Sequence, residues 1–184
     1  MTSRAHAALL LAAGGSRRLG TAKQLLLVEG EPLVRRAALF VVVGARADEV
    51  YAVVADLAAS VHRVDCVDWQ QGLSSSLRAG IAALPDRIDT ALVALCDQPA
   101  MDVTHLETLV QQSVQQPGRA IASGYAGVLG VPAVLPREWF PELLGLSGDV
   151  GARELLRRHA DRVEVDDAPA LAQDVDAPGD RARL

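Results

Sequence analysis

A segment rich in small residues follows the first apolar run of this 184-residue chain and carries two kinds of cation. Its small residues are Gly14, Gly15 and Ser16, and its cations include Arg18 and Lys23. Small residues let the backbone approach a ligand closely and turn N–H groups toward phosphate oxygens, while the cations supply opposite charge. The pattern therefore predicts a phosphate-binding loop, and the alternative is a glycine-rich turn without a ligand.

Two familiar phosphate motifs do not fit this loop. Gly15 and Gly20 have the spacing of a P-loop, but Thr21 and Ala22 stand where that motif needs Lys followed by Ser or Thr. Ser16 takes the place of the second glycine of the dinucleotide fingerprint. This mismatch disfavours a nicotinamide-dependent oxidoreductase.

Lys23 is the only lysine, because the other seventeen of the eighteen basic residues are arginines. Arginine and lysine are nearly equivalent on a solvated surface, but not where a compact ammonium group must contact one phosphate. The composition, poor in Lys, Asn and Ile, is typical of a GC-rich coding sequence, so a retained lysine favours a functional position. The alternative is survival by chance.

A carboxylate stands at the end of a second apolar run. Residues 90–95 are apolar and suited to a strand, and Asp97 follows them in the segment LCDQP. A carboxylate held at the end of a buried strand suits a hard divalent cation such as Mg²⁺. The alternative is that Asp97 caps a turn or the next helix. The acidic tail around Asp176 has its own alternative, a merely solvated segment.

Strand-like and helix-like segments alternate along the chain. We expect strands at residues 7–13, 50–55, 63–67, 90–95, 119–123, 131–135 and 162–165. We expect helices at 32–43, from Ser74 or Ser75 to about 84, from 102 to about 115, at 137–144 and at 150–159. This order predicts an α/β fold with a mostly parallel sheet, in which ligands bind at the carboxyl ends of strands. No repeat or linker interrupts it, so residues 1–184 are expected to form a single domain.

Composition narrows the class of protein. Half of the residues are apolar and 22% are charged, which is enough to bury a core. The net charge of −5 argues against binding a nucleic-acid backbone. Two cysteines cannot build a disulfide framework, and no apolar run reaches the roughly 18 residues that span a bilayer. We expect a soluble, cytoplasmic protein with no nucleic-acid or membrane partner, whose four histidines lie at the surface.

The motifs occur in an order known from one enzyme family. LAAGGSRRLG with its lysine, DWQQGLSSSLRAG, LCDQP, GVLGVP, GDVGARELL and DVDAPGD follow one another over about residues 7–180. In this order they resemble the MobA-like nucleotidyltransferases, and most nearly their molybdenum cofactor cytidylyltransferase branch. The resemblance implies a three-layer Rossmann-like nucleotidyltransferase fold.

The resemblance also implies a role for each site residue. Lys23, Arg18 and Asp97 would be catalytic, with Lys23 stabilising charge at the α-phosphate and on the leaving pyrophosphate. Asp97 would hold Mg²⁺, with Asp176 as a second metal ligand. The residues expected to bind the nucleotide are Leu11, Ala12, Ala13, Gly14, Gly15, Ser16, Arg18, Lys23, Ser76 and Gly80.

The second substrate would meet Gly148, Asp149 and Arg153. The alternative for Arg153 is a charge pair with Glu154 at the start of a helix. The reaction implied is transfer of CMP from CTP to the terminal phosphate of molybdopterin, a phosphorylated pterin, with release of pyrophosphate. A molybdenum hydroxylase or its maturation factor would be the protein partner.

The choice of base follows from one residue. In this family LAAG accompanies cytidine transfer and LAGG accompanies guanosine transfer, so Ala13 favours CTP. Two alternatives stay open. One is a relative that uses GTP or another phosphorylated acceptor, as for members found beside purine or nicotine catabolism genes. The other is a non-catalytic molybdenum cofactor chaperone, which would not need Lys23 and Asp97.

Overall fold

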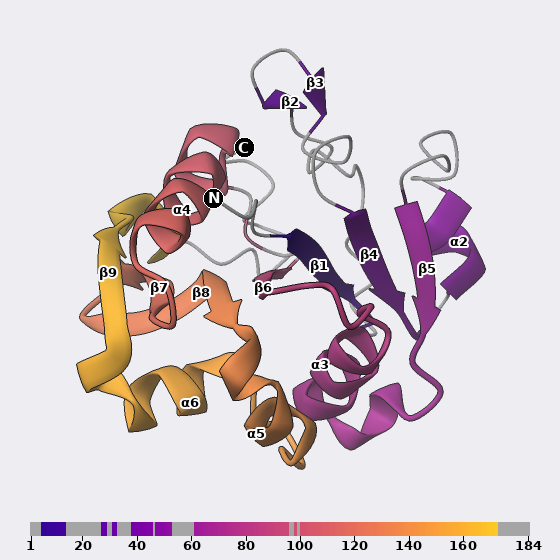
Figure 1. The fold of residues 1–184 in the computed structure, drawn as a ribbon. Coiled ribbons are helices and arrows are strands. Elements are labelled where there is room, and N and C mark those ends of the chain that lie inside the picture. Colours follow the sequence, from indigo (N-terminus) through magenta and orange to yellow (C-terminus); the bar gives the residue numbers. More distant parts are fainter. Residues whose placement is uncertain are drawn as a thin grey trace.

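The computed structural model contains a seven-stranded sheet with helices on both of its faces (Figure 1). It describes residues 5–13, 27–28, 31–32, 38–45, 47–52, 61–95, 98 and 100–172. The described strands are β1 (His6–Ala12), β2 (Leu27–Val28), β3 (Glu31–Pro32), β4 (Ala38–Val43), β5 (Val61–Asp65), β6 (Thr90–Leu95), β7 (Ala120–Tyr125), β8 (Val128–Pro136) and β9 (Val163–Asp167). The described α-helices are α2 (Ala47–Ala52), α3 (Leu73–Ala82), α4 (Val103–Gln115), α5 (Phe140–Leu144) and α6 (Ala152–Arg158).

The order of strands in the large sheet is β5-β4-β1-β6-β8-β7-β9. The central β1 pairs in parallel with both β4 and β6, and β5 extends this parallel half. Among the described strands of this sheet, only β8 runs against its neighbours, pairing antiparallel with β6 and β7. Two antiparallel steps restore the direction, so β7 and its parallel partner β9 end at the same edge as β6. The predicted mostly parallel sheet is confirmed.

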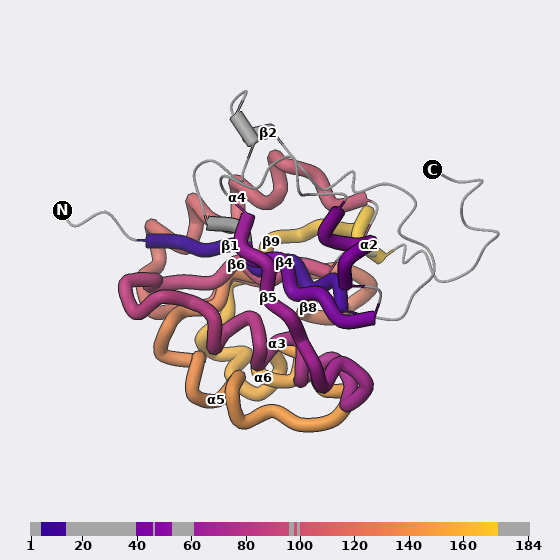
Figure 2. The backbone as a smooth tube through the Cα atoms, turned by 90° about the vertical axis from the view of Figure 1, so that its right-hand side faces the viewer, coloured from indigo at the N-terminus to yellow at the C-terminus, as the bar shows by residue number. Residues whose placement is uncertain are grey.

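Two apolar layers hold the helices to the sheet. Side chains of α3, α5 and α6 pack on one face with alternate residues of β1 such as Leu9 and Leu11. Side chains of α4 and α2 pack on the other face with Ala8 and Leu10. Figure 2 shows the layers from the side of β5, with α4 above the sheet and α3, α5 and α6 below it. A strand covered on both faces explains why the sequence of β1 is an unbroken apolar run.

Most of the expected elements are present near their expected positions, among them β1, β5 to β9 and helices α3 to α6. Asp102 caps α4 as predicted, its side chain accepting a hydrogen bond of 2.8 Å from the N–H of His105. The start of α3 is different, because the residue that precedes the helix is Gly72 rather than Ser74 or Ser75. Among the described helices, none is long and apolar enough to cross a membrane.

The predicted helix over residues 32–43 is wrong where the structure describes this segment. Residues 38–43, with the sequence ALFVVV, form strand β4 between β1 and β5. The apolar spacing of this segment fits one face of a helix, but its β-branched residues and phenylalanine favour a strand. Parallel pairing on both sides, together with the burial of Val42 and Val43, decides for the strand.

The predicted strand over residues 50–55 is also wrong where the structure describes it, since residues 47–52 form helix α2. Asp48 and Glu49 lie in its first turn, where acidic side chains favour a helix. Ala47, Val50 and Tyr51 pack together on the sheet, and this i, i+3, i+4 spacing is helical rather than alternating.

Gly80 sets how closely α3 approaches the sheet. A Cβ atom at this position would lie 3.0 Å from Val42 Cγ2 and 3.3 Å from Leu9 Cδ1. Contacts this short leave no room for a branched side chain between the helix and strands β1 and β4.

We therefore expect Gly80→Val to lower the free energy of unfolding by about 1–3 kcal/mol, the usual cost of overpacking a core. Urea denaturation followed by circular dichroism measures the change. The control is Ala82→Val, which introduces the same side chain at an exposed position of the same helix and should cost only about 0.7 kcal/mol or less. Equal losses in the two variants would contradict this role of Gly80.

Candidate active site

The parallel strands β1, β4 and β6 end at one edge of the sheet. Ala12 of β1 lies opposite Val43 of β4, and Leu11 of β1 lies opposite Leu95 of β6. The chain therefore leaves these strands at Ala13, Gly44 and the segment after Leu95, side by side. Ligands of open α/β sheets bind outside the carboxyl ends of strands. This edge is the candidate active site.

The structure describes only part of the predicted site. Leu11, Ala12 and Ala13 are buried at the end of β1, with Leu11 and Ala13 on the α3 face and Ala12 on the α4 face. Ser76, Gly80, Gly148, Asp149 and Arg153 are also described. The other predicted site residues lie outside the described residues, so their roles stay predictions: Gly14, Gly15, Ser16, Arg18, Lys23, Asp97 and Asp176.

Ala13 belongs to a tight contact at this edge. The N–H of Ala45 donates to the carbonyl oxygen of Ala13 over 3.2 Å, which ties the ends of β1 and β4 together. A Cβ atom on Gly44 would lie 2.9 Å from Ala13 Cβ and 2.6 Å from Trp69 Cβ. The methyl group of Ala13 therefore occupies space next to Gly44 and the start of the Trp69 side chain.

Two segments that are expected to bind different substrates touch one another here. They are DWQQGLSSSLRAG, expected at the nucleotide, and GDVGARELL, expected at the acceptor. A Cβ atom on Gly72 would lie 2.7 Å from the carbonyl oxygen of Gly148 and 2.9 Å from Asp149 Cα. Gly72 also has a φ of +105°, a conformation that L side chains rarely adopt. Only glycine fits at this crossing, which brings the expected nucleotide segment against the expected acceptor segment.

The acceptor segment accepts hydrogen bonds from the first turn of α3. Asp149 Oδ1 accepts from the N–H of Leu73 over 3.3 Å. The carbonyl oxygen of Gly148 accepts from Ser74, over 2.7 Å from the hydroxyl and 3.3 Å from the N–H. Because Gly72 has no side chain to cap the helix, Asp149 supplies the missing carboxylate from another part of the chain.

The three serines of α3 differ in what they bind. The hydroxyl of Ser75 donates to the carbonyl oxygen of Gly72 over 2.7 Å, so it is used within the helix start, as the hydroxyl of Ser74 is used by Gly148. No hydrogen bond to Ser76 Oγ is present among the described residues, although Ser76 is 5% exposed. Ser76 lies one turn before Gly80 on the face toward the sheet. Gly80 itself is covered by Leu9 and Val42 rather than open to a ligand.

Arg153 is available for an anion. It is exposed in the first turn of α6, and within the described structure no hydrogen bond or ion pair holds its guanidinium group. Glu154, the alternative partner, instead accepts from Arg157 over 3.0 Å. This hydrogen bond lowers the pKa of Glu154 below its ordinary value. The charge pair considered for Arg153 and Glu154 is therefore not formed.

Sequence reasoning gave no role to Gln98, which directly follows Asp97. Its side chain is 2% exposed, and its Nε2 donates to the carbonyl oxygen of Val131 over 2.7 Å and to Tyr125 Oη over 3.4 Å. Its Oε1 is buried and has no hydrogen-bond partner in the part of the chain that the structure describes. A buried acceptor left unpaired is uncommon and marks the end of β6 as a special position. The signal in the sequence is the polar residue that follows Asp97 directly in LCDQP.

His105 was expected at the surface, but its side chain is only 12% exposed. Its Nδ1 lies 3.0 Å from Asp166 Oδ2 and its Nε2 lies 2.7 Å from Ser123 Oγ. A Ser–His–Asp set suggests a hydrolase, but Ser123 is fully buried and its hydroxyl donates to the carbonyl oxygen of Pro132 over 2.6 Å. A nucleophile needs access to substrate, so this set is structural and joins α4, β7 and β9.

Comparison with known proteins identifies the family of the chain. Residues 8–163 match the family described as the MobA-like NTP transferase domain. The chain belongs to this family. It is therefore a nucleotidyltransferase, as the order of its motifs predicted. A curated relative, the purine catabolism protein PucB of Bacillus subtilis, is 30% identical over 166 residues, covering 81% of this chain and 79% of PucB.

Solved structures share the fold. Rv0371c of Mycobacterium tuberculosis H37Rv superposes with a TM-score of 0.71 and 28% identity, covering 100% of this chain and 98% of Rv0371c. A nucleotidyl transferase of Methanothermobacter thermautotrophicus gives 0.71 at 21% identity, covering 98% and 96%. The molybdopterin-guanine dinucleotide biosynthesis protein A of Archaeoglobus fulgidus gives 0.57 at 16% identity, covering 96% of this chain and 95% of that protein. The three-layer Rossmann-like nucleotidyltransferase fold is thereby confirmed.

The cap that Asp149 provides to α3 gives a direct test of the crossing. We expect Asp149→Ala to lower the free energy of unfolding by about 1 kcal/mol, because the N–H of Leu73 loses its acceptor. Asp149→Asn, which keeps an oxygen at the same place, should restore most of the stability. Urea denaturation measures all three proteins. An alanine variant as stable as the parent would show that this contact does not hold the two segments together.

Proposed function

We propose that this protein transfers CMP from CTP to the terminal phosphate of molybdopterin in a Mg²⁺-dependent reaction. Its membership of the MobA-like family supports nucleotidyl transfer. The link to molybdenum cofactor is supported by the motif order and by one structural neighbour named for molybdopterin-guanine dinucleotide synthesis. The PucB relative, named for purine catabolism, supports service to a molybdenum hydroxylase or its maturation factor.

One observation carries the proposal. The first motif leaves β1, LCDQP leaves β6, and the Gly72 and Gly148 segments cross at α3, all at one edge of the sheet. Four motifs that are far apart in the sequence thus begin or lie at this edge. A reaction between two phosphorylated substrates needs this convergence, because most of the catalysis consists of positioning and charge neutralisation.

The proposed reaction needs no catalytic base. The terminal phosphate of the acceptor is ionised at neutral pH, and one of its oxygens attacks the α-phosphorus of CTP. A P–O bond forms there as the bond from the α-phosphorus to the bridging oxygen breaks, and pyrophosphate leaves with the electron pair. In this account Lys23 and Arg18 neutralise charge at the α-phosphate and on pyrophosphate, while Gly14, Gly15 and Ser16 offer N–H groups.

The proposed reaction uses a divalent cation. The donor set proposed for it, Asp97 and Asp176, consists of carboxylates, which are the hard oxygen ligands that Mg²⁺ prefers. Within the described residues, no cluster of three histidine, cysteine or acidic side chains offers a competing metal site. A structure of Rv0371c in complex with manganese also supports a divalent cation. When bound, the cation would neutralise negative charge on the phosphates.

Ala13 supports the choice of CTP. Its methyl group lies on the α3 face beside Gly44 and Trp69, at the end of the strand from which the phosphate loop departs. A methyl group there narrows the space next to the base and favours a pyrimidine over a purine. Ser76, buried on the same face without a hydrogen bond among the described residues, is proposed to offer its hydroxyl to the nucleotide.

The acceptor phosphate is proposed to meet Arg153. Its guanidinium group, which has no partner among the described residues, suits a phosphate, which it can bind through two parallel N–H···O bonds. Gly148 and Asp149 carry the chain past α3 just before this residue, so the crossing fixes where α6 begins. The roles of Gly148 and Asp149 are then to position the acceptor segment.

We expect Lys23→Ala to lower the turnover number by roughly 10²–10³, as removal of one transition-state charge contact does. Pyrophosphate release from CTP in the presence of molybdopterin measures it. The matched control is Arg87→Ala, which removes an exposed cation from the loop before β6, at the opposite edge of the sheet. Near-normal turnover in the Lys23 variant, with its fold intact by circular dichroism, would remove Lys23 from the mechanism.

A further inference from the structure

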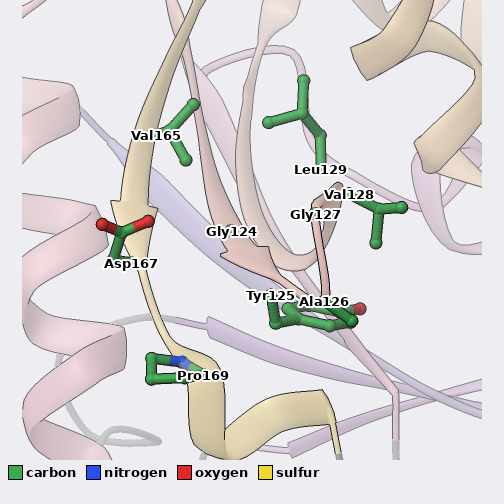
Figure 3. Close-up of a pocket in the computed structure, with 9 residues that line it drawn as sticks. All are labelled: Gly124, Tyr125, Ala126, Gly127, Val128, Leu129, Val165, Asp167 and Pro169. Carbon is green, nitrogen blue, oxygen red and sulfur yellow. The ribbon is translucent and has the colours of Figure 1, made fainter.

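A cavity lies further along the same edge of the sheet, between the β7–β8 turn and β9 (Figure 3). Its volume is about 440 Å³, and its walls are formed by Gly124, Tyr125, Ala126, Gly127, Val128, Leu129, Val165, Asp167 and Pro169. Val165 of β9 and Leu129 of β8 stand on either side of Gly124 in this view. Sequence reasoning gave no role to any of these residues, although Gly127, Val128 and Leu129 belong to the GVLGVP motif.

Gly124 keeps this cavity open. A Cβ atom at Gly124 would lie 2.7 Å from Val165 Cγ1 and 3.2 Å from Asp167 Oδ1. Val165 is an aliphatic side chain with 45% of its surface exposed, although Val163, two residues earlier on the same face, is buried in the core. The apolar wall that Val165 and Leu129 provide is thus exposed only at this end of the sheet.

The walls select the chemistry of a ligand. Asp167 is the one charged residue among those that line the cavity, and in the described part of the chain no hydrogen bond or ion pair engages its carboxylate. With no cation in the walls, a carboxylate repels a phosphate or triphosphate group. The remaining walls are mostly apolar, which suits a flat ring. A ring that presents two adjacent N–H donors would pair with both carboxylate oxygens.

The cavity is connected to the end of β6. Tyr125, one of its walls, donates its hydroxyl to the carbonyl oxygen of Val131 over 3.0 Å, and Gln98 Nε2 contacts both groups. Gln98 follows Asp97, the proposed metal ligand. The buried amide therefore fixes the β7–β8 turn relative to the strand end where the phosphates are proposed to react.

From these observations we propose that this cavity binds the pterin ring of the acceptor, with Asp167 accepting hydrogen bonds from its amino group and adjacent ring N–H. The assignment rests on the proposed function, which supplies a phosphorylated pterin as second substrate. A pterin has the two adjacent donors that the cavity calls for, and its phosphate is carried on the opposite side of the ring system.

The spacing of strands agrees with this orientation. Strands β8, β7 and β9 follow β6 in the sheet, so the cavity lies one to three strand spacings from the end of β6, roughly 5–15 Å. A fused ring with a short phosphorylated side chain spans that range. With the ring against Asp167, the phosphate points along the edge toward β6 and α6. Helix α6 packs against β8, and Arg153 in its first turn has no hydrogen bond or ion pair within the described structure.

The test is a fluorescence titration with 6-hydroxymethylpterin in the presence of Mg²⁺ and CTP. We expect Asp167→Asn to weaken pterin binding roughly tenfold to a hundredfold, as loss of hydrogen bonds to a charged group does. Val165→Phe, which fills the cavity from an exposed position, should also abolish binding. The matched control is Asp161→Asn, an exposed aspartate just before β9 at the opposite edge of the sheet.

A second ligand tests the contribution of the Asp167 carboxylate to binding separately. 6-Hydroxymethyllumazine has an oxygen in place of the amino group, so the parent protein should bind it more weakly than the pterin, and Asp167→Asn should remove this difference. Pterin binding that is absent in the parent, or unchanged in both cavity variants, overturns the assignment. Titration with CTP alone tests the proposed function separately, because Asp167 and Val165 should not affect it.

Discussion

The parallel pairing of β1 with β4 and β6 is the constraint on which the rest of the structure depends. It places Ala13, Gly44 and the end of β6 at one edge, with β1 buried on both faces by the two helix layers. A shift of one residue in this register would exchange the faces of Leu9 and Leu10 and separate the strand ends. The positions from which the predicted phosphate loop and the proposed metal ligand depart are therefore fixed by the core itself.

Two glycines allow α3 to lie close to the sheet and to the Gly148 segment. Gly80 lets α3 lie against Leu9 and Val42, and Gly72 lets the start of α3 touch Gly148 and Asp149. Since Asp149 also caps α3, the two segments expected to bind substrates are held by one helix end rather than by separate loops. Gln98 extends the same edge to the β7–β8 turn. The result is one continuous edge, from β4 to β9, with the proposed phosphate site at one half and the mostly apolar cavity at the other.

Much of this could be predicted from the sequence, because buried strands and capped helices leave local signals. The apolar run of β1 and the cap at Asp102 are examples, as is the family of the chain. The segment 38–43 was misassigned because its apolar spacing fits a helix, and only its pairing on both sides decides for a strand. The cavity beside Asp167 could not be predicted, since β7, β8 and β9 meet there only in the folded chain, although three of its walls belong to the GVLGVP motif.

The central claim, that this edge binds CTP for nucleotidyl transfer, is tested most directly by isothermal titration of the purified protein with CTP and with GTP, each with Mg²⁺. The account predicts saturable binding of CTP that is stronger than binding of GTP, because Ala13 narrows the space beside the base. Stronger binding of GTP would overturn the assignment of the base while keeping the family. Binding of neither nucleotide would contradict the account and would favour a cofactor chaperone.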